Sequence, residues 1–163
     1  MASVNSPIRK FVKPLLYKLL GERGYFWFQY YGKLRDIEKR LVEEPEMELL
    51  PQLLTADSVS LDIGANYAYY TVRLAQLCPQ GRVHAFEPIP GTYEICKKLV
   101  EHYGFRNVEL FQKGVGAKNE KIEFEVPLQD MGTISAGQAH IKGRNNDMEG
   151  KEKYHAFAKH RTF

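Results

Sequence analysis

Residues 58–66, Ser-Val-Ser-Leu-Asp-Ile-Gly-Ala-Asn, constrain the fold of this chain more than any other segment. Their alternate aliphatic residues predict a buried strand: Val59, Leu61 and Ile63. Gly64 then predicts a tight turn, because a residue without a Cβ tolerates sharp turns and close approach of a ligand. Asn66 is a favourable helix N-cap, and residues 67–77 have helical character. A strand, a glycine turn and a helix N-terminus together predict a nucleotide-binding cradle.

Two acidic residues stand at the ends of successive predicted strands. Asp62 ends the first strand, and burying its carboxylate costs several kcal/mol unless a partner is supplied. Asp62 either accepts backbone N–H groups of the loop or faces a bound cation or ammonium. Glu87 ends the second strand, residues 82–87, and lies 25 residues after Asp62. An acid at this position of a βαβ unit typically binds a ribose diol, at an expected offset of about 20 residues.

The motifs around these acids resemble the FkbM family of S-adenosylmethionine (SAM)-dependent methyltransferases. They are Leu61-Asp-Ile-Gly-Ala-Asn66, Tyr69-Tyr70-Thr71, and Ala85-Phe-Glu-Pro88 with Pro90, and the resemblance covers about residues 44–133. It implies a class I methyltransferase fold with SAM as cofactor. By this resemblance, the predicted cofactor-binding residues are Asp62, Gly64, Ala65, Asn66, Tyr70, Glu87, Pro88 and Gly114. Ala68 departs from the family pattern, which usually has a glycine there.

The expected fold is α/β, a Rossmann-like class I methyltransferase domain that is incomplete. Three parallel strands are expected at 58–63, 82–87 and 107–111, with a strand at 121–126 antiparallel to its predecessor. The expected organisation is a helical, basic and aromatic N-terminal extension at 1–54, a partial SAM-binding core at 55–127, and a polar, irregular segment at 128–163. Helices are also expected at 45–54, 90–103 and 151–160.

The family fold has about seven strands, with the first near the middle of its sheet, whereas this chain supplies only the first three and a hairpin partner. The first strand should therefore be an exposed edge, which promotes self-association. Three explanations stay open: a piece of a longer protein, a sheet completed from elsewhere, or a remnant without activity. On this view the chain alone holds at most the cofactor half of the site.

Residues 8–31 join a basic apolar helix to the aromatic run Tyr25-Phe-Trp-Phe-Gln-Tyr-Tyr31. The segment either packs on the domain, which is the favoured interpretation, or lies at a membrane surface as an interfacial anchor. No signal peptide and no membrane-spanning helix are predicted. Cys78 and Cys96 are expected to be buried reduced thiols, which fits a cytoplasmic protein that touches the membrane at most peripherally. His140, His155 and His160 match no metal-ligand spacing, so no metal is expected.

The predicted function is SAM-dependent methyl transfer, with oxygen of a small molecule or glycan as the acceptor. No catalytic base can be assigned. One alternative is a non-catalytic, membrane-peripheral nucleotide- or SAM-binding module. An NAD-binding domain is disfavoured because the first strand is not followed by G-x-G-x-x-G. The formal net charge of +3 is too small to indicate nucleic-acid binding.

Overall fold

The computed structural model describes the backbone of residues 7–42, 44–116, 121–129, 133–134, 140–141 and 153–159, and the side chains of 15–42 and 44–116. Its first sheet contains β1 (Val59–Ile63), β2 (Arg82–Phe86) and β3 (Val108–Phe111) in the order β1-β2-β3. The strands are parallel, and Ser60 pairs with Val83, which pairs with Val108. The three predicted parallel strands are therefore confirmed.

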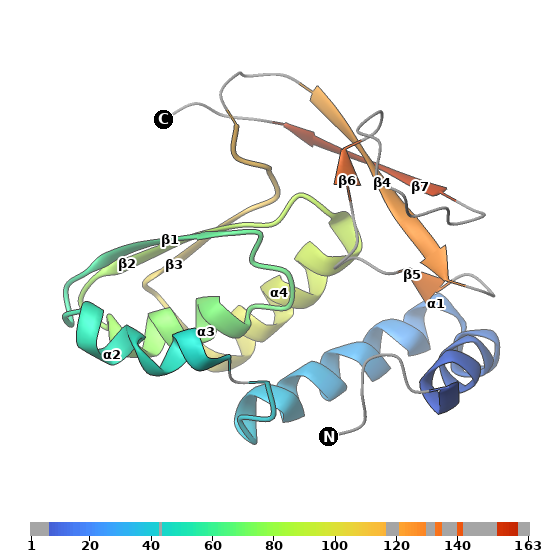
Figure 1. Cartoon of the computed structure of the whole chain (residues 1–163), viewed down its shortest axis with the longest axis horizontal. Helices are drawn as coiled ribbons and strands as arrows, with labels where there is room; N and C mark the ends of the chain where they lie inside the picture. The colour runs from blue at the N-terminus through green and yellow to red at the C-terminus, as the bar shows by residue number, and fades with distance from the viewer. Residues whose placement is uncertain are drawn as a thin grey trace.

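Two helices connect these strands and lie on one face of the sheet (Figure 1). α3 (Tyr69–Leu77) joins β1 to β2, and α4 (Pro90–Tyr103) joins β2 to β3. Pro90 occupies the first helical position, where its missing N–H costs nothing, and Gly104 ends the helix with a φ of 64°. The β1-α3-β2-α4-β3 order with parallel strands is a Rossmann-like α/β unit, as predicted.

The core lies between the sheet and these helices. Its most buried apolar side chains are Ala68, Val72, Cys78, Val83, Ala85, Cys96 and Leu99. They come from the sheet, from both helices, and from the ends of α3. Parallel sheets are normally covered on both faces. The helices α3 and α4 cover only one face of this sheet.

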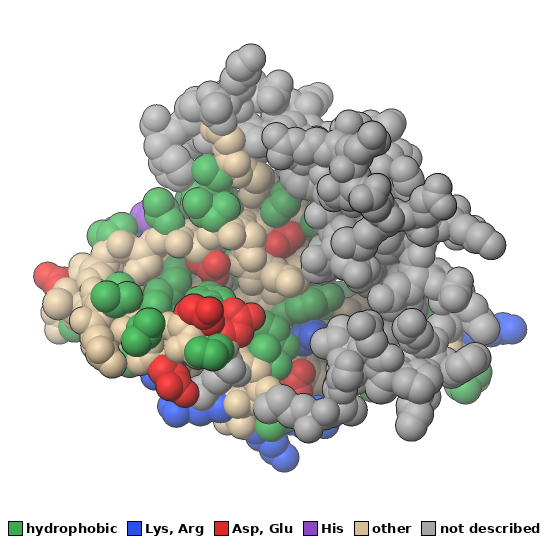
Figure 2. Space-filling view, in the orientation of Figure 1, with side chains coloured by type: hydrophobic (Ala, Val, Ile, Leu, Met, Phe, Trp, Pro, Cys, Tyr) green, Lys and Arg blue, Asp and Glu red, His purple; other side chains and the backbone are tan. Residues whose placement is uncertain are grey.

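The strand β1 has a free edge and a free face within the described chain. It pairs with β2 on one side and with no other described strand. Along β1, burial alternates, so Ser60 lies under the helices at 8% exposure while its neighbours point to the opposite face. Those neighbours are Val59 at 68%, Leu61 at 56% and Ile63 at 62% exposure. Figure 2 shows hydrophobic side chains over the upper margin of this sheet. The prediction of an exposed first strand is confirmed for this part of the chain.

A second, antiparallel sheet corrects two predictions. β4 (Lys121–Gln129) pairs with β5 (Thr133–Ile134), β6 (His140–Ile141) and β7 (Lys153–Lys159). The strand expected at 121–126 exists, but no pairing with β3 is described, so the predicted hairpin is wrong. The helix expected at 151–160 is also wrong, because β7 pairs with β4 along residues 121–127. Such long-range pairing overrides weak local helix propensity.

The N-terminal helix α1 (Pro7–Glu38) is interrupted at Gly21, whose φ of 63° and ψ of 179° are non-helical. After this break α1 packs against the domain through Tyr30 and Leu34, which are 7% and 8% exposed and share a cluster with Leu99 of α4. Trp27 is 45% exposed, so packing shields it only in part. No described helix is long and apolar enough to cross a membrane; contact with a membrane surface stays a prediction.

The helix predicted at residues 45–54 is divided into two short elements. η1 (Pro45–Glu48) is a 3₁₀ turn, and α2 (Leu50–Leu53) is a single helical turn. Pro51 explains the division, because it lacks the N–H that a continuous helix needs. Met47 is buried, whereas Leu49 and Leu53 are 51% and 74% exposed.

Candidate functional site

The carboxyl ends of β1, β2 and β3 meet at one edge of the sheet because the strands are parallel. The loops that leave this edge hold most of the predicted cofactor residues. Residues 64–66 follow β1, Glu87 and Pro88 follow β2, and Gly114 follows β3. In open α/β sheets, ligands bind outside this edge. The fold therefore brings together three segments that are far apart in the sequence.

The loop after β1 has a left-handed backbone. Gly64 has a φ of 82°, Asn66 of 49° and Ala68 of 60°. The N–H groups of Gly64 and Ala65 both donate to the carbonyl oxygen of Phe86 at 2.9 Å, which ties the loop to the end of β2. A Cβ at Gly64 would meet nothing within 4 Å, so its positive φ, rather than crowding, is what favours glycine. Space remains beside its backbone.

Asn66 is not the helix N-cap, which corrects the sequence prediction. The N-cap of α3 is Ala68, and no side chain caps the helix. The Asn66 N–H instead donates to Glu87 Oε2 at 2.8 Å. Asn66 Oδ1 is buried and has no hydrogen-bond partner among the described residues. A buried acceptor without a donor is costly, so this atom marks a position where a ligand donor would be favourable.

Glu87 lies at the centre of the sheet edge and is only 5% exposed. Its Oε2 accepts the Asn66 N–H, and its Oε1 accepts the N–H of Ile89 at 2.9 Å, across Pro88. Burial raises the pKa of Glu87, although these two hydrogen bonds act in the opposite direction. A carboxylate has about four acceptor sites, so each oxygen can still accept another donor. Glu87 thus joins two loops and retains capacity for a diol.

Asp62 is half-buried and is held by the helix that follows it. Thr71 Oγ1, on α3, donates to Asp62 Oδ2 at 2.5 Å. Burial raises the pKa of Asp62 despite this hydrogen bond. Of the two interpretations from sequence, stabilisation within the protein is supported, because Asp62 accepts hydrogen bonds from both the side chain and the backbone of Thr71. Thr71 belongs to the motif Tyr69-Tyr70-Thr71, but the sequence did not indicate that it donates a hydrogen bond to Asp62.

Cys96 of α4 is fully buried beside the two acids, and its thiol is free. Burial, followed by the charges of Asp62 and Glu87, raises its pKa to about 12, while a hydrogen bond with Thr71 lowers it. The thiol therefore stays protonated and unreactive near neutral pH. This confirms the prediction of a buried thiol and makes Cys96 part of the floor of the site.

Tyr70 and Gly114 are less closely joined to this arrangement. The Tyr70 hydroxyl donates to Glu44 Oε2 at 2.7 Å, and this hydrogen bond is the main reason that the pKa of Tyr70 rises to about 12. Its polar atom is thus engaged by the segment that precedes η1. Gly114 is half-buried in the loop after β3. A cofactor role for either residue stays a prediction.

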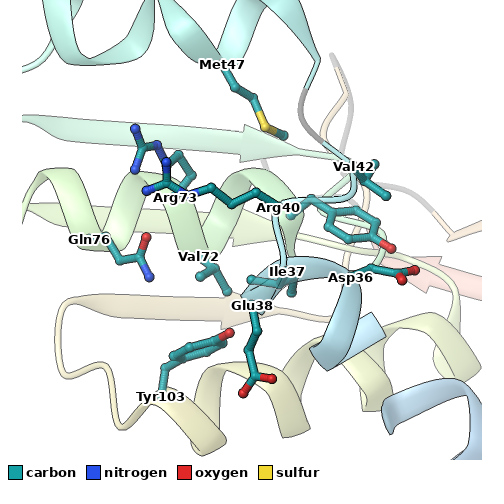
Figure 3. Close-up of a pocket in the computed structure, with 11 residues that line it drawn as sticks. Asp36, Ile37, Glu38, Arg40, Val42, Met47, Val72, Arg73, Gln76 and Tyr103 are labelled. Carbon is teal, nitrogen blue, oxygen red and sulfur yellow. The ribbon is translucent and has the colours of Figure 1, made fainter. Parts of the chain in front are cut away.

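A separate pocket of about 310 Å³ lies between the end of α1, the following segment, α3 and α4 (Figure 3). The Arg40 side chain extends toward Arg73, and Asp36 and Glu38 supply the opposite charge. Ile37, Val42, Met47 and Val72 supply apolar walls. None of the predicted cofactor residues lines this pocket, so it plays no part in the site at the sheet edge.

Ala68 provides a stability test of the unusual loop backbone. Ala68→Gly should change the free energy of unfolding by less than about 0.5 kcal/mol. Relief of about 1–2 kcal/mol of left-handed strain offsets the loss of a buried methyl and the greater freedom of glycine when unfolded. Ala75→Gly is the matched control, because Ala75 is 2% exposed inside α3; it should cost about 2 kcal/mol. Equal costs in urea titrations would contradict the strained loop.

The sequence is similar to that of one curated enzyme. Methyltransferase 1 of Beauveria bassiana (strain ARSEF 2860) is 25% identical over 103 residues, which are 63% of this chain and 40% of that protein. The chain resembles a methyltransferase. It spans well under half the length of this curated relative. No family model matches the sequence.

Several solved methyltransferases are also similar. Precorrin-6y C5,15-methyltransferase from Geobacter metallireducens GS-15 is 29% identical with a TM-score of 0.38, over 44% of this chain and 40% of that one. A Streptococcus mutans protein assigned as a methyltransferase, solved with SAH (the demethylated product of SAM), is 24% identical with a TM-score of 0.40, over 45% and 42%. A SAM-dependent methyltransferase from Aquifex aeolicus is 22% identical with a TM-score of 0.37, over 53% and 48%. These overlaps are partial, so the fold is assigned from the strand topology.

Proposed function

We propose that this chain binds SAM and SAH at the carboxyl edge of β1, β2 and β3 and takes part in SAM-dependent methyl transfer. The observation that carries the proposal is the Glu87 carboxylate, which is buried after β2 and hydrogen-bonded to the loop that follows β1. Methyltransferases among the similar proteins support it, and one of them was solved with SAH. We also propose methyl transfer as the activity of the whole protein.

The residues at the sheet edge fit such a cofactor. Its ribose offers two hydroxyl donors, and Glu87 has free acceptor capacity on both oxygens. Its amino-acid part offers an ammonium, and Asn66 Oδ1 is a buried acceptor without a partner among the described residues. The open space beside Gly64 allows close approach to the backbone. We assign diol binding to Glu87, and positioning of the loop to Asp62 through Thr71.

The bound cofactor supplies an activated methyl group on sulfur, so the protein has to bind, orient and exclude water. Glu87 would fix the ribose, and the loop of residues 64–66 would fix the remainder of the cofactor against β1. By resemblance to the FkbM family, the acceptor is an oxygen of a small molecule or glycan. No described residue is assigned as the base. A module that binds SAM without catalysis would use the same residues.

Titration calorimetry with SAM, SAH and NAD tests this proposal. SAM and SAH should both bind with one site per chain, and NAD should bind at least tenfold more weakly, because no G-x-G-x-x-G loop follows β1. Tight binding of NAD with no response to SAM or SAH would contradict the proposal and favour the dinucleotide alternative. Methyl transfer from radiolabelled SAM to a cell extract then separates an enzyme from a non-catalytic binding module.

A further inference from the structure

The loop that follows β1 is strained and has no helix cap of its own. Asn66 and Ala68 both have a positive φ, which is unfavourable for residues that carry a Cβ. No side chain caps α3, which begins directly after this loop. A strained backbone persists only where the surrounding structure holds it. Hydrogen bonds to Phe86 and Glu87 hold the N–H groups of residues 64–66 against the end of β2.

The N-terminal helix α1 contacts the side chains of the same loop. Tyr30 and Leu34 of α1 share one buried cluster with Ala65 and Ala68, and Tyr67 packs against this cluster. Ala68 is fully buried, although its backbone is left-handed. The loop is therefore held by β2 through its backbone and by α1 through its side chains.

Two polar side chains of α1 engage Tyr67. Lys33 Nζ lies 4.3 Å from the centre of the Tyr67 ring, within the range of a cation–π contact. It also lies 5.7 Å from the centre of the Tyr69 ring, so one cation meets both neighbours of Ala68. The Tyr67 hydroxyl donates to Gln29 Oε1 at 3.4 Å. Burial is the main reason that the pKa of Tyr67 rises to about 12, so this hydroxyl stays protonated near neutral pH.

From these contacts we propose that α1 is a working part of the cofactor site. The contacts of Lys33 and Gln29 with Tyr67, which we call the Tyr67 clamp, hold the loop of residues 64–68 in its binding conformation. Lys33 and Gln29 are positioning residues, because they act on the loop through Tyr67. The clamp is a property of the free chain, whereas its role in binding SAM rests on the proposed function.

The Tyr67 clamp would link α1 to the affinity for the cofactor. The clamped loop places the Asn66 N–H on Glu87 and keeps the space beside Gly64 open. Both features are lost together when the loop opens. The apparent affinity for a ligand falls with the fraction of chains that have the competent conformation. Loss of the clamp should therefore weaken SAM and SAH while every group that binds them is still present.

Hydrogen exchange of the free chain tests the clamp. Lys33→Met keeps a long side chain but removes its charge, so the hydrogen-bonded amides of residues 64–68 should exchange about three- to thirtyfold faster. Lys33→Arg keeps a cation that stacks on aromatic rings, and should exchange at the native rate. Lys39→Met is the matched control, because Lys39 lies exposed just after α1. The amides of α4 should be unchanged in all three variants.

Two results of this experiment would overturn the clamp. One is equal exchange of the loop in the native chain and in Lys33→Met. The other is a uniform rise in the loop and in α4, which would show a general loss of stability instead of a released loop.

Titration calorimetry with SAH tests the role of the clamp in the site. Lys33→Met should weaken SAH by about three- to thirtyfold, and Lys33→Arg should restore the affinity. In a chain that already carries Tyr67→Leu, and so lacks the ring, Lys33→Met should have no further effect. Unchanged affinity in Lys33→Met, or additive losses in the double variant, would overturn this role. Failure of the native chain to bind SAH would contradict the proposed function, and the exchange rates would still decide the clamp.

Discussion

Glu87→Gln should lower the affinity for SAH by about ten- to a hundredfold. The substitution keeps the shape of the side chain but removes the charge and one acceptor oxygen. Hydrogen bonds to charged groups contribute roughly 1.5–3 kcal/mol, which sets the expected range. Glu101→Gln is the matched control, because Glu101 is an exposed residue near the end of α4 that pairs with Lys98. Titration calorimetry should show its affinity within about twofold of the native value.

The same variant should reveal a cost of keeping Glu87 charged. Burial raises the pKa of Glu87 in the folded chain above the ordinary value of 4.5. At a pH between 4.5 and this raised pKa, the native state therefore binds more protons than the unfolded state. The free energy of unfolding contributed by Glu87 therefore falls as the pH rises through 4.5 toward the folded pKa. Glu87→Gln lacks this fall, so the native chain should lose stability relative to the variant from pH 4 to pH 7.

Glu101 gives the opposite sign and serves as the control for this pH dependence. Its hydrogen bond with Lys98 lowers its pKa, so its stabilising contribution is present above the ordinary value and is lost as the pH falls. Urea titrations of native, Glu87→Gln and Glu101→Gln chains at several pH values separate the two cases. The same pH trend for both variants would contradict the buried position of Glu87.

Gly81→Ala should destabilise the fold by about 3 kcal/mol, and lower the melting temperature by about 10 °C. A Cβ on Gly81 would lie 1.9 Å from the carbonyl oxygen of Ser58, which is the oxygen that accepts the Arg82 N–H at the start of the β1–β2 pairing. The obstacle is backbone, so no side-chain rotation relieves it. The two strands would have to separate at the point where their register begins.

Gly91→Ala is the control for this substitution. Gly91 lies in the first turn of α4, and a Cβ there would meet nothing within 4 Å. Because alanine is the better helix former, this variant should be unchanged or more stable by up to about 1 kcal/mol. Circular dichroism melts of both variants compare the same chemical change at two glycines. Similar small effects would show that β1 and β2 do not approach as described.

The sequence was sufficient to predict the α/β core and the meeting of its acids. Apolar runs bounded by glycine and proline defined β1 and β2, and parallel strands bring their carboxyl ends together whatever their length. The positions of Glu87 and the Gly64 turn followed from this. Their side-chain partners did not, because the Thr71–Asp62 bond depends on how α3 packs over the strand, which local pattern does not specify.

Other features were missed because a competing interaction decided them. Asn66 has good N-cap chemistry, but its backbone is left-handed, with a φ of 49°, rather than extended as in an N-cap, and the helix begins later, at Tyr69. Pro51 was visible in the sequence and should have divided the helix at residues 45–54. The strand β7 could not be predicted locally, because it depends on pairing with β4 more than twenty residues away.

The central claim is that Glu87 binds the ribose diol of the cofactor, and a double-variant cycle measures this most directly. Calorimetry would give the affinities of native and Glu87→Gln chains for SAH and for an SAH analogue without its ribose 2′-hydroxyl. If Glu87 accepts that hydroxyl, its removal should weaken binding to the native chain about ten- to a hundredfold, but should have little effect on the variant. Independent, additive losses, or no binding of SAH by the native chain, would contradict the claim.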